Sequence, residues 1–162
     1  MQISWLLAGP LLIAIGAHST QHAPVVTALD LPLDQFVGPV RAGSLCLPHG
    51  RMRVADFFRS ARDLQSMVDE ATEEATYPHG RYSAIRLTAL DVRLCAKSWG
   101  ILGLGDRQRL SGESRFTFIS ERPEGSKAER VIVLELTGKQ ALRPDEIARE
   151  AIRRLILTDD PV

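Results

Sequence analysis

The sequence predicts an α+β domain with the element order β-α-β-β-β-α, in which two helices cover one face of a mainly antiparallel sheet. Residues 53–75 place apolar side chains at spacings of three and four, which is typical of a helix with one buried side. Residues 82–96, 114–120 and 129–136 are rich in strand-forming residues. Residues 144–157 begin with acidic side chains and continue with arginines, as the helix dipole favours.

The 162 residues divide into three expected parts: a signal peptide at 1–19, an extended tether at 20–42 and a single α+β domain at 43–162. Up to Leu29 the chain contains no Asp, Glu, Lys or Arg, and Ile3–Ala17 is almost wholly apolar. That run is short for a membrane-spanning helix, which needs about 20 residues. We therefore expect a periplasmic or secreted protein, with membrane anchoring by an uncleaved N-terminal segment as the alternative.

The expected tether combines three prolines with isolated apolar residues and shows no sustained periodicity. The folded region is therefore predicted to begin near Gly43. Its first element is a short strand at 44–48, where a proline ends the run of strand formers.

The helix predicted at 53–75 has one alternative. Residues Met52–Phe57 could instead form a strand, and the helix would then begin at Ser60. In either case Pro78 and Gly80 would end the helical region, because proline and glycine both oppose helix continuation.

The strand at 82–96 does not alternate evenly, because its apolar residues change parity between Leu87 and Leu90. A β-bulge near Ala89 would keep all of them on one face of the sheet. Alternatively, the strand changes its buried face along its length. The two later strands are separated by residues 121–127, whose proline and glycine predict a hairpin turn.

A tetrapeptide occurs twice, as Pro48-His49-Gly50-Arg51 and as Pro78-His79-Gly80-Arg81. A single helix over 53–75 would separate the two histidines by about 35 Å at 1.5 Å per residue, so they could not share one metal ion. Proline and glycine are typical of turns. We interpret the two copies as unrelated turns.

No pattern in the chain predicts a catalytic residue, a cofactor or a metal site. Twenty basic and twenty acidic side chains give a formal net charge of zero, so no nucleic-acid partner is expected. The glycines of residues 100–105 lack the spacing of a phosphate-binding loop. The acidic residues at 69–74 are typical of a solvated helix face.

The two cysteines, Cys46 and Cys95, predict one disulfide formed in an oxidising compartment. On each strand the neighbouring apolar residues would face the hydrophobic core and the cysteine would face the other way. Both sulfurs would therefore emerge on the same face of the sheet. We expect the two residues on neighbouring strands, with α-carbons within about 7 Å. The alternative is a pair of reduced thiols in a cytosolic protein.

The element order from Ser44 to Leu157, after an export signal, resembles that of small envelope lipoproteins of Gram-negative bacteria. The similar groups are the lipopolysaccharide-assembly lipoprotein and the auxiliary lipoproteins of envelope transporters. Members of these groups are typically anchored through a lipid-modified cysteine, and this chain has no cysteine directly after its apolar N-terminal run. The resemblance implies a role in binding or envelope assembly without catalysis.

Two functional hypotheses follow. The first is an exported, non-enzymatic binding or envelope-assembly module whose partner is another envelope protein or envelope component. Such a module would contact the membrane only transiently through its signal peptide, or through an uncleaved anchor. Its candidate interface consists of Trp99, Ile101, Leu102, Leu104, Arg86, Arg93 and Arg115. Trp99 could instead fold back over the core. The second is a small periplasmic hydrolase or thiol-redox protein that uses His49, His79 or the Cys46/Cys95 pair.

Overall fold

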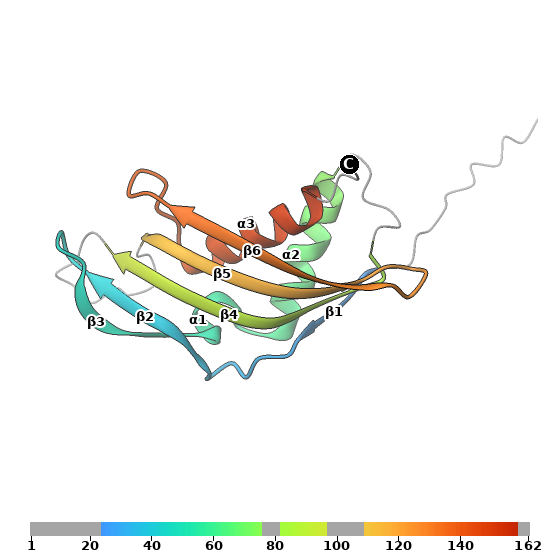
Figure 1. The fold of residues 1–162 in the computed structure, drawn as a ribbon, viewed down its shortest axis with the longest axis horizontal. Helices are drawn as coiled ribbons and strands as arrows, with labels where there is room; N and C mark the ends of the chain where they lie inside the picture. Colours follow the sequence, from blue (N-terminus) through green and yellow to red (C-terminus); the bar gives the residue numbers. More distant parts are fainter. Residues whose placement is uncertain (1–23, 76–81, 97–108, 159–162) are drawn as a thin grey trace, which may run out of the picture.

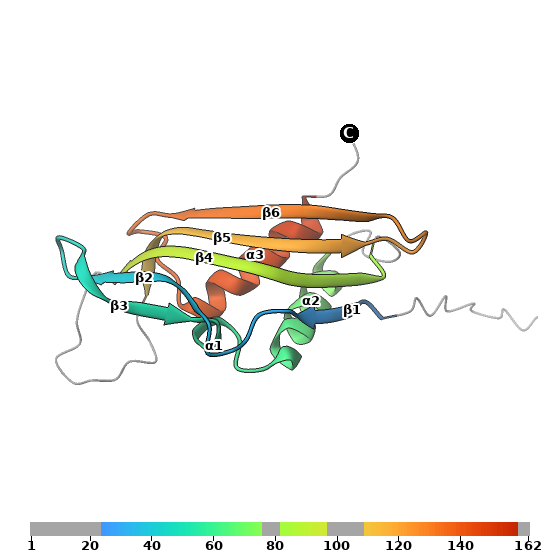
Figure 2. The same ribbon diagram turned by 60° about the horizontal axis from the view of Figure 1, so that its bottom comes forward.

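A computed structural model describes residues 24–75, 82–96 and 109–158 of the chain. In these ranges the protein is a single sheet with helices packed against one of its faces (Figures 1 and 2). The elements in chain order are β1 (Val26–Leu29), β2 (Phe36–Ala42), β3 (Leu47–Arg53), α1 (Val54–Phe57), α2 (Ala61–Glu74), β4 (Ala84–Ala96), β5 (Leu110–Glu121), β6 (Lys127–Leu136) and α3 (Pro144–Leu157).

The six-stranded sheet has the order β3-β2-β4-β5-β6, and β1 pairs with β4 as well. The β2–β3, β4–β5 and β5–β6 pairs are antiparallel, whereas β1 and β2 both run parallel to β4. β1 pairs with the beginning of β4 and β2 with its end, so the β2–β3 hairpin lies at the opposite end of the sheet from β1 (Figure 1). The predicted fold class, α+β with a mainly antiparallel sheet, is confirmed.

The hydrophobic core lies between the sheet and the helices α2 and α3, which pack on each other and on the same side of the sheet (Figure 2). Three phenylalanines form its centre: the ring of Phe116 lies 6.2 Å from that of Phe57, edge to face, and 6.2 Å from that of Phe118, stacked. All three are almost completely buried. The other face of the sheet carries no helix among the described residues.

The tether expected at 20–42 is wrong for the residues that the structure describes, 24–42. Residues 24–42 belong to the domain, because they supply β1 and β2 and bury Leu31 and Val37. The short apolar stretches between the prolines are strand segments, and a strand of four residues is too short to show a clear period. The predicted signal peptide at 1–19 lies outside the described residues.

The single helix expected at 53–75 is also wrong, because the chain forms two helices with a break at 58–60. Asp63 accepts hydrogen bonds from the backbone N–H of Arg59 and from the hydroxyl of Ser60, which starts a new helix at this point. The break allows both Phe57 and Phe58 to point into the core. The alternative with a later helix start is therefore close to the structure, although the preceding strand ends at Arg53.

The strand expected at 44–48 lies later, at Leu47–Arg53, so the first copy of the repeated tetrapeptide is part of β3 and not a turn. Proline is tolerated there because β3 is an edge strand with one partner, β2. The second copy, at 78–81, lies outside the described residues. The bulge expected near Ala89 is confirmed by a register shift between Leu87 and Ala89.

The acidic residues of α2 do more than face solvent, because two of them pair with arginines of α3. Glu70 pairs with Arg149, and Glu74 accepts hydrogen bonds from Arg153 at 2.9–3.1 Å. The hydrogen bond from Arg153 lowers the pKa of the Glu74 carboxyl. These exposed pairs link the two helices, and each contributes little to stability because its charges remain solvated.

Candidate functional site

The predicted disulfide is present: Cys46 and Cys95 are joined, with α-carbons 5.6 Å apart. Cys95 lies on β4, opposite Arg41 of β2. Cys46, however, lies in the turn that precedes β3 and has a positive φ of 48°, so its expected position on a strand is wrong. The bond therefore fastens the turn of the β2–β3 hairpin to the end of β4.

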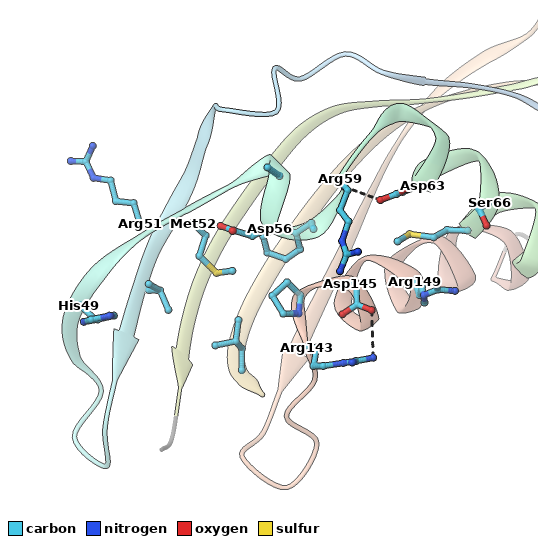
Figure 3. Close-up of a pocket in the computed structure, with 16 residues that line it drawn as sticks. His49, Arg51, Met52, Asp56, Arg59, Asp63, Ser66, Arg143, Asp145 and Arg149 are labelled. Carbon is cyan, nitrogen blue, oxygen red and sulfur yellow. Dashed lines mark hydrogen bonds and ion pairs between the residues drawn. The ribbon is translucent and has the colours of Figure 1, made fainter. Parts of the chain in front are cut away.

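A groove of about 670 Å³ opens between β3, α1, the start of α2 and the start of α3 (Figure 3). Its charged lining combines both signs, with Arg59, Asp63, Arg143, Asp145 and Arg149 near its centre. Such a concave surface is where a substrate site would be sought first.

Most charged groups of this groove already have structural partners. Arg143 pairs with Asp145 at 3.5 Å, and Asp56 accepts a hydrogen bond from the backbone N–H of Arg53 at 2.7 Å. Figure 3 shows His49 and Ser66 at opposite ends of the groove, so they do not form a nucleophile–base pair. The groove therefore offers no arrangement that favours the hydrolase hypothesis. The second histidine of that hypothesis, His79, lies outside the described residues.

The three arginines of the predicted interface do not form one cluster. Arg86 pairs with Asp30 at 2.8 Å, and that hydrogen bond raises the pKa of Arg86. Arg115 pairs with Glu113 at 3.6 Å. Arg93 is exposed near the other end of β4, away from Arg86. The apolar part of the predicted interface, residues 99–104, lies outside the described residues.

Arg93 instead adjoins a group of arginines on β2 and β3 that sequence reasoning missed. Arg41 lies opposite Cys95, two residues beyond Arg93 on β4, so the strand period places Arg41 and Arg93 on the same face. The helix-free face of β3 carries Arg51 and Arg53, whose guanidinium groups lie 5.6 and 5.1 Å from the ring centroid of Phe36. We call these residues the arginine face: Phe36, Arg41, Arg51, Arg53 and Arg93.

The arginine face gathers four arginines on the adjacent strands β3, β2 and β4, with Glu113 of β5 opposite Arg93. Within residues 24–75, 82–96 and 109–158, none of its four guanidinium groups forms an ion pair. All four side chains are exposed, and the ring of Phe36 between two of them is 51% exposed. Figure 3 shows the side chain of Arg51, at the edge of the groove, extending away from the other labelled residues.

A weak signal in the sequence could have indicated this surface. Arg51 and Arg53 alternate with the buried Met52, which is the period of a strand with one solvated face. The prediction assigned Arg41 to the tether that ends at 42, Arg51 to a turn and Arg53 to the helix that begins at 53. These arginines were therefore not recognised as one face of adjacent strands.

Comparison with protein-family models, with curated proteins and with solved structures finds no match for this chain. Among the described residues, no group of three or more His, Cys, Asp or Glu side chains could hold a metal ion. No helix in the described ranges is long and apolar enough to cross a membrane. The exposed arginines around Phe36 make the arginine face the candidate functional site.

Proposed function

We propose that the protein is an exported, periplasmic, non-enzymatic binding or envelope-assembly module that uses the arginine face to bind an acidic component of the cell envelope. The observation that carries the proposal is the set of four exposed guanidinium groups without carboxylate partners, two of which lie over the ring of Phe36.

The charge pattern favours a binding role for this face. Four like charges on adjacent strands repel each other, and a partner that supplies negative charge relieves this repulsion. Arginine suits such a partner because its planar guanidinium binds carboxylate or phosphate through two parallel hydrogen bonds. Phe36 adds exposed apolar area at the start of β2, beside Arg51 and Arg53, as aromatic residues do in many interfaces.

Two further features support a periplasmic location. The disulfide is of the kind that persists in oxidising compartments. The uncharged, apolar N-terminal sequence has the length of a signal peptide. The element order, which resembles that of small envelope lipoproteins, supports a role in binding or assembly. Retention through an uncleaved N-terminal segment is the alternative to release.

The double substitution Arg51→Gln with Arg93→Gln should weaken binding of the purified protein to isolated envelope fractions in a sedimentation assay. The matched control is Arg86→Gln with Arg115→Gln, which removes two arginines from the same sheet face and changes the net charge equally. In the control the lost arginines are already paired with Asp30 and Glu113. We expect a loss of about tenfold or more in the first variant and little change in the second.

Binding of the unchanged protein should also fall as salt is raised, because exposed charges are screened. Equal losses in the two double variants would show that only net charge matters, and the arginine face would then have no special role.

A further inference from the structure

The tip of the β2–β3 hairpin, residues 43–47, carries two of the most exposed apolar side chains in the described part of the protein. Leu45 is 79% exposed and Leu47 is 61% exposed. They flank Cys46, whose disulfide to Cys95 holds the tip against the end of β4. Leu45 therefore projects from a fastened turn and Leu47 begins β3, at the end of the sheet that is opposite to β1 (Figure 1).

Positive charge surrounds this apolar tip. The chain contains no Asp or Glu between Asp34 and Asp56, so the whole hairpin carries arginines without a carboxylate. Arg41 lies opposite Pro48 just behind the tip. Arg109 is exposed beside Leu110, which pairs with Ala96 at the same end of the sheet.

We infer that the acidic component bound by the arginine face is the surface of an anionic phospholipid bilayer, and that Leu45 and Leu47 enter its headgroup layer. This inference rests on the proposed function and names its target. The arginines behind the tip would bind lipid phosphates while their aliphatic stems lie along the apolar boundary.

The combination of an apolar tip with cations favours a bilayer over an acidic protein. A partner protein that covers the arginine face would leave Leu45 in water, because Leu45 lies in the turn beyond the last strand pair, Ala42 and Leu47. A bilayer engages both features at once. Two leucines alone would bind membranes only marginally, and stable attachment to a membrane surface generally needs an apolar insertion together with basic residues.

The direct test is quenching of tryptophan fluorescence by brominated phospholipids in vesicles that contain phosphatidylglycerol. The full-length variant Leu45→Trp is compared with Val131→Trp, a control at another exposed apolar position, 49% exposed on β6. The native tryptophans and the N-terminal segment are common to both variants. We expect stronger quenching in Leu45→Trp than in Val131→Trp, and equal quenching would overturn the inference.

A second measurement separates this inference from the proposed function. In vesicle sedimentation, each of Arg51→Gln and Arg93→Gln should weaken binding to phosphatidylglycerol vesicles about fivefold, while binding to vesicles of phosphatidylcholine alone stays low. If protease treatment of envelope fractions abolishes binding, the target is an acidic protein; the lipid inference then fails and the proposed function stands. If the arginine variants and their control bind equally well to vesicles and to envelope fractions, both the lipid inference and the proposed function fail.

Discussion

The double substitution Cys46→Ser with Cys95→Ser should lower the free energy of unfolding by about 4 kcal/mol and the melting temperature by about 10 °C. The disulfide closes a loop with a sequence separation of 49 residues, so its loss enlarges the unfolded ensemble considerably. Thermal unfolding followed by circular dichroism measures the change. Reduction of the unchanged protein should reproduce most of it.

Binding to envelope fractions separates a structural disulfide from a redox-active one. The double variant should keep most of its binding below its melting temperature, because the backbone pairing of β2 with β3 and β4 still positions the arginines when the disulfide is absent. Loss of binding with unchanged stability would favour the thiol-redox hypothesis. Two reactive thiols in the unfolded, unreduced protein would show that the bond does not form.

The substitution Gly38→Ala should destabilise the protein by about 3 kcal/mol or more, through backbone strain and steric overlap together. Gly38 has a φ of 149°, and a Cβ at this position would lie 1.9 Å from the carbonyl oxygen of Val92. Because that oxygen belongs to the backbone of β4, the overlap can be relieved only by moving β2 away from the sheet. Urea-induced unfolding gives the free energy change.

Gly125→Ala is the matched control for this prediction. Gly125 also has a positive φ, 86°, but an added Cβ would meet no atom within 4 Å. This variant should lose only about 1 kcal/mol, the cost of the left-handed backbone conformation. Comparable losses in the two variants would argue against close packing of β2 on β4. Because β2 carries Phe36 and Arg41, a folded Gly38→Ala variant should also bind envelope fractions more weakly.

The elements that sequence analysis predicted well are those with long, regular patterns. The last helix was predicted at 144–157 and has those bounds, because its apolar residues and terminal charges follow the helical period over three turns. The bulge near Ala89 was equally visible, because a strand that keeps one buried face must insert a residue where the parity changes.

The elements that were missed are short or depend on tertiary contacts. β1 has four residues and pairs only with β4, so its sequence carries almost no periodic signal. At the break before α2, Asp63 accepts hydrogen bonds from the backbone N–H of Arg59 and the hydroxyl of Ser60, and the regular apolar period on both sides conceals this break in the sequence.

The candidate site was predictable only in part. Arg93 was expected on the uncovered face, and the structure places it there, but its arginine neighbours come from strands that sequence analysis had assigned to a tether and a turn. Arg86 pairs with Asp30, which directly follows β1, whereas Arg115 pairs with Glu113 two residues away on the same strand, β5. The pairing of Arg86 therefore depends on the strand order, which places β1 beside β4 and which no local sequence pattern reports.

In vivo photo-crosslinking tests the central claim most directly. A photoreactive amino acid replaces Pro48, which lies opposite Arg41 beside the arginine face. In the control it replaces Val131 on β6. We expect adducts with an envelope component at Pro48 and none at Val131. Mass spectrometry of the adduct should place the mature N-terminus between Gly16 and Ala23. No adduct at Pro48, or an intact Met1 on protein from the cytoplasm, would contradict the account of an exported module that binds through its arginine face.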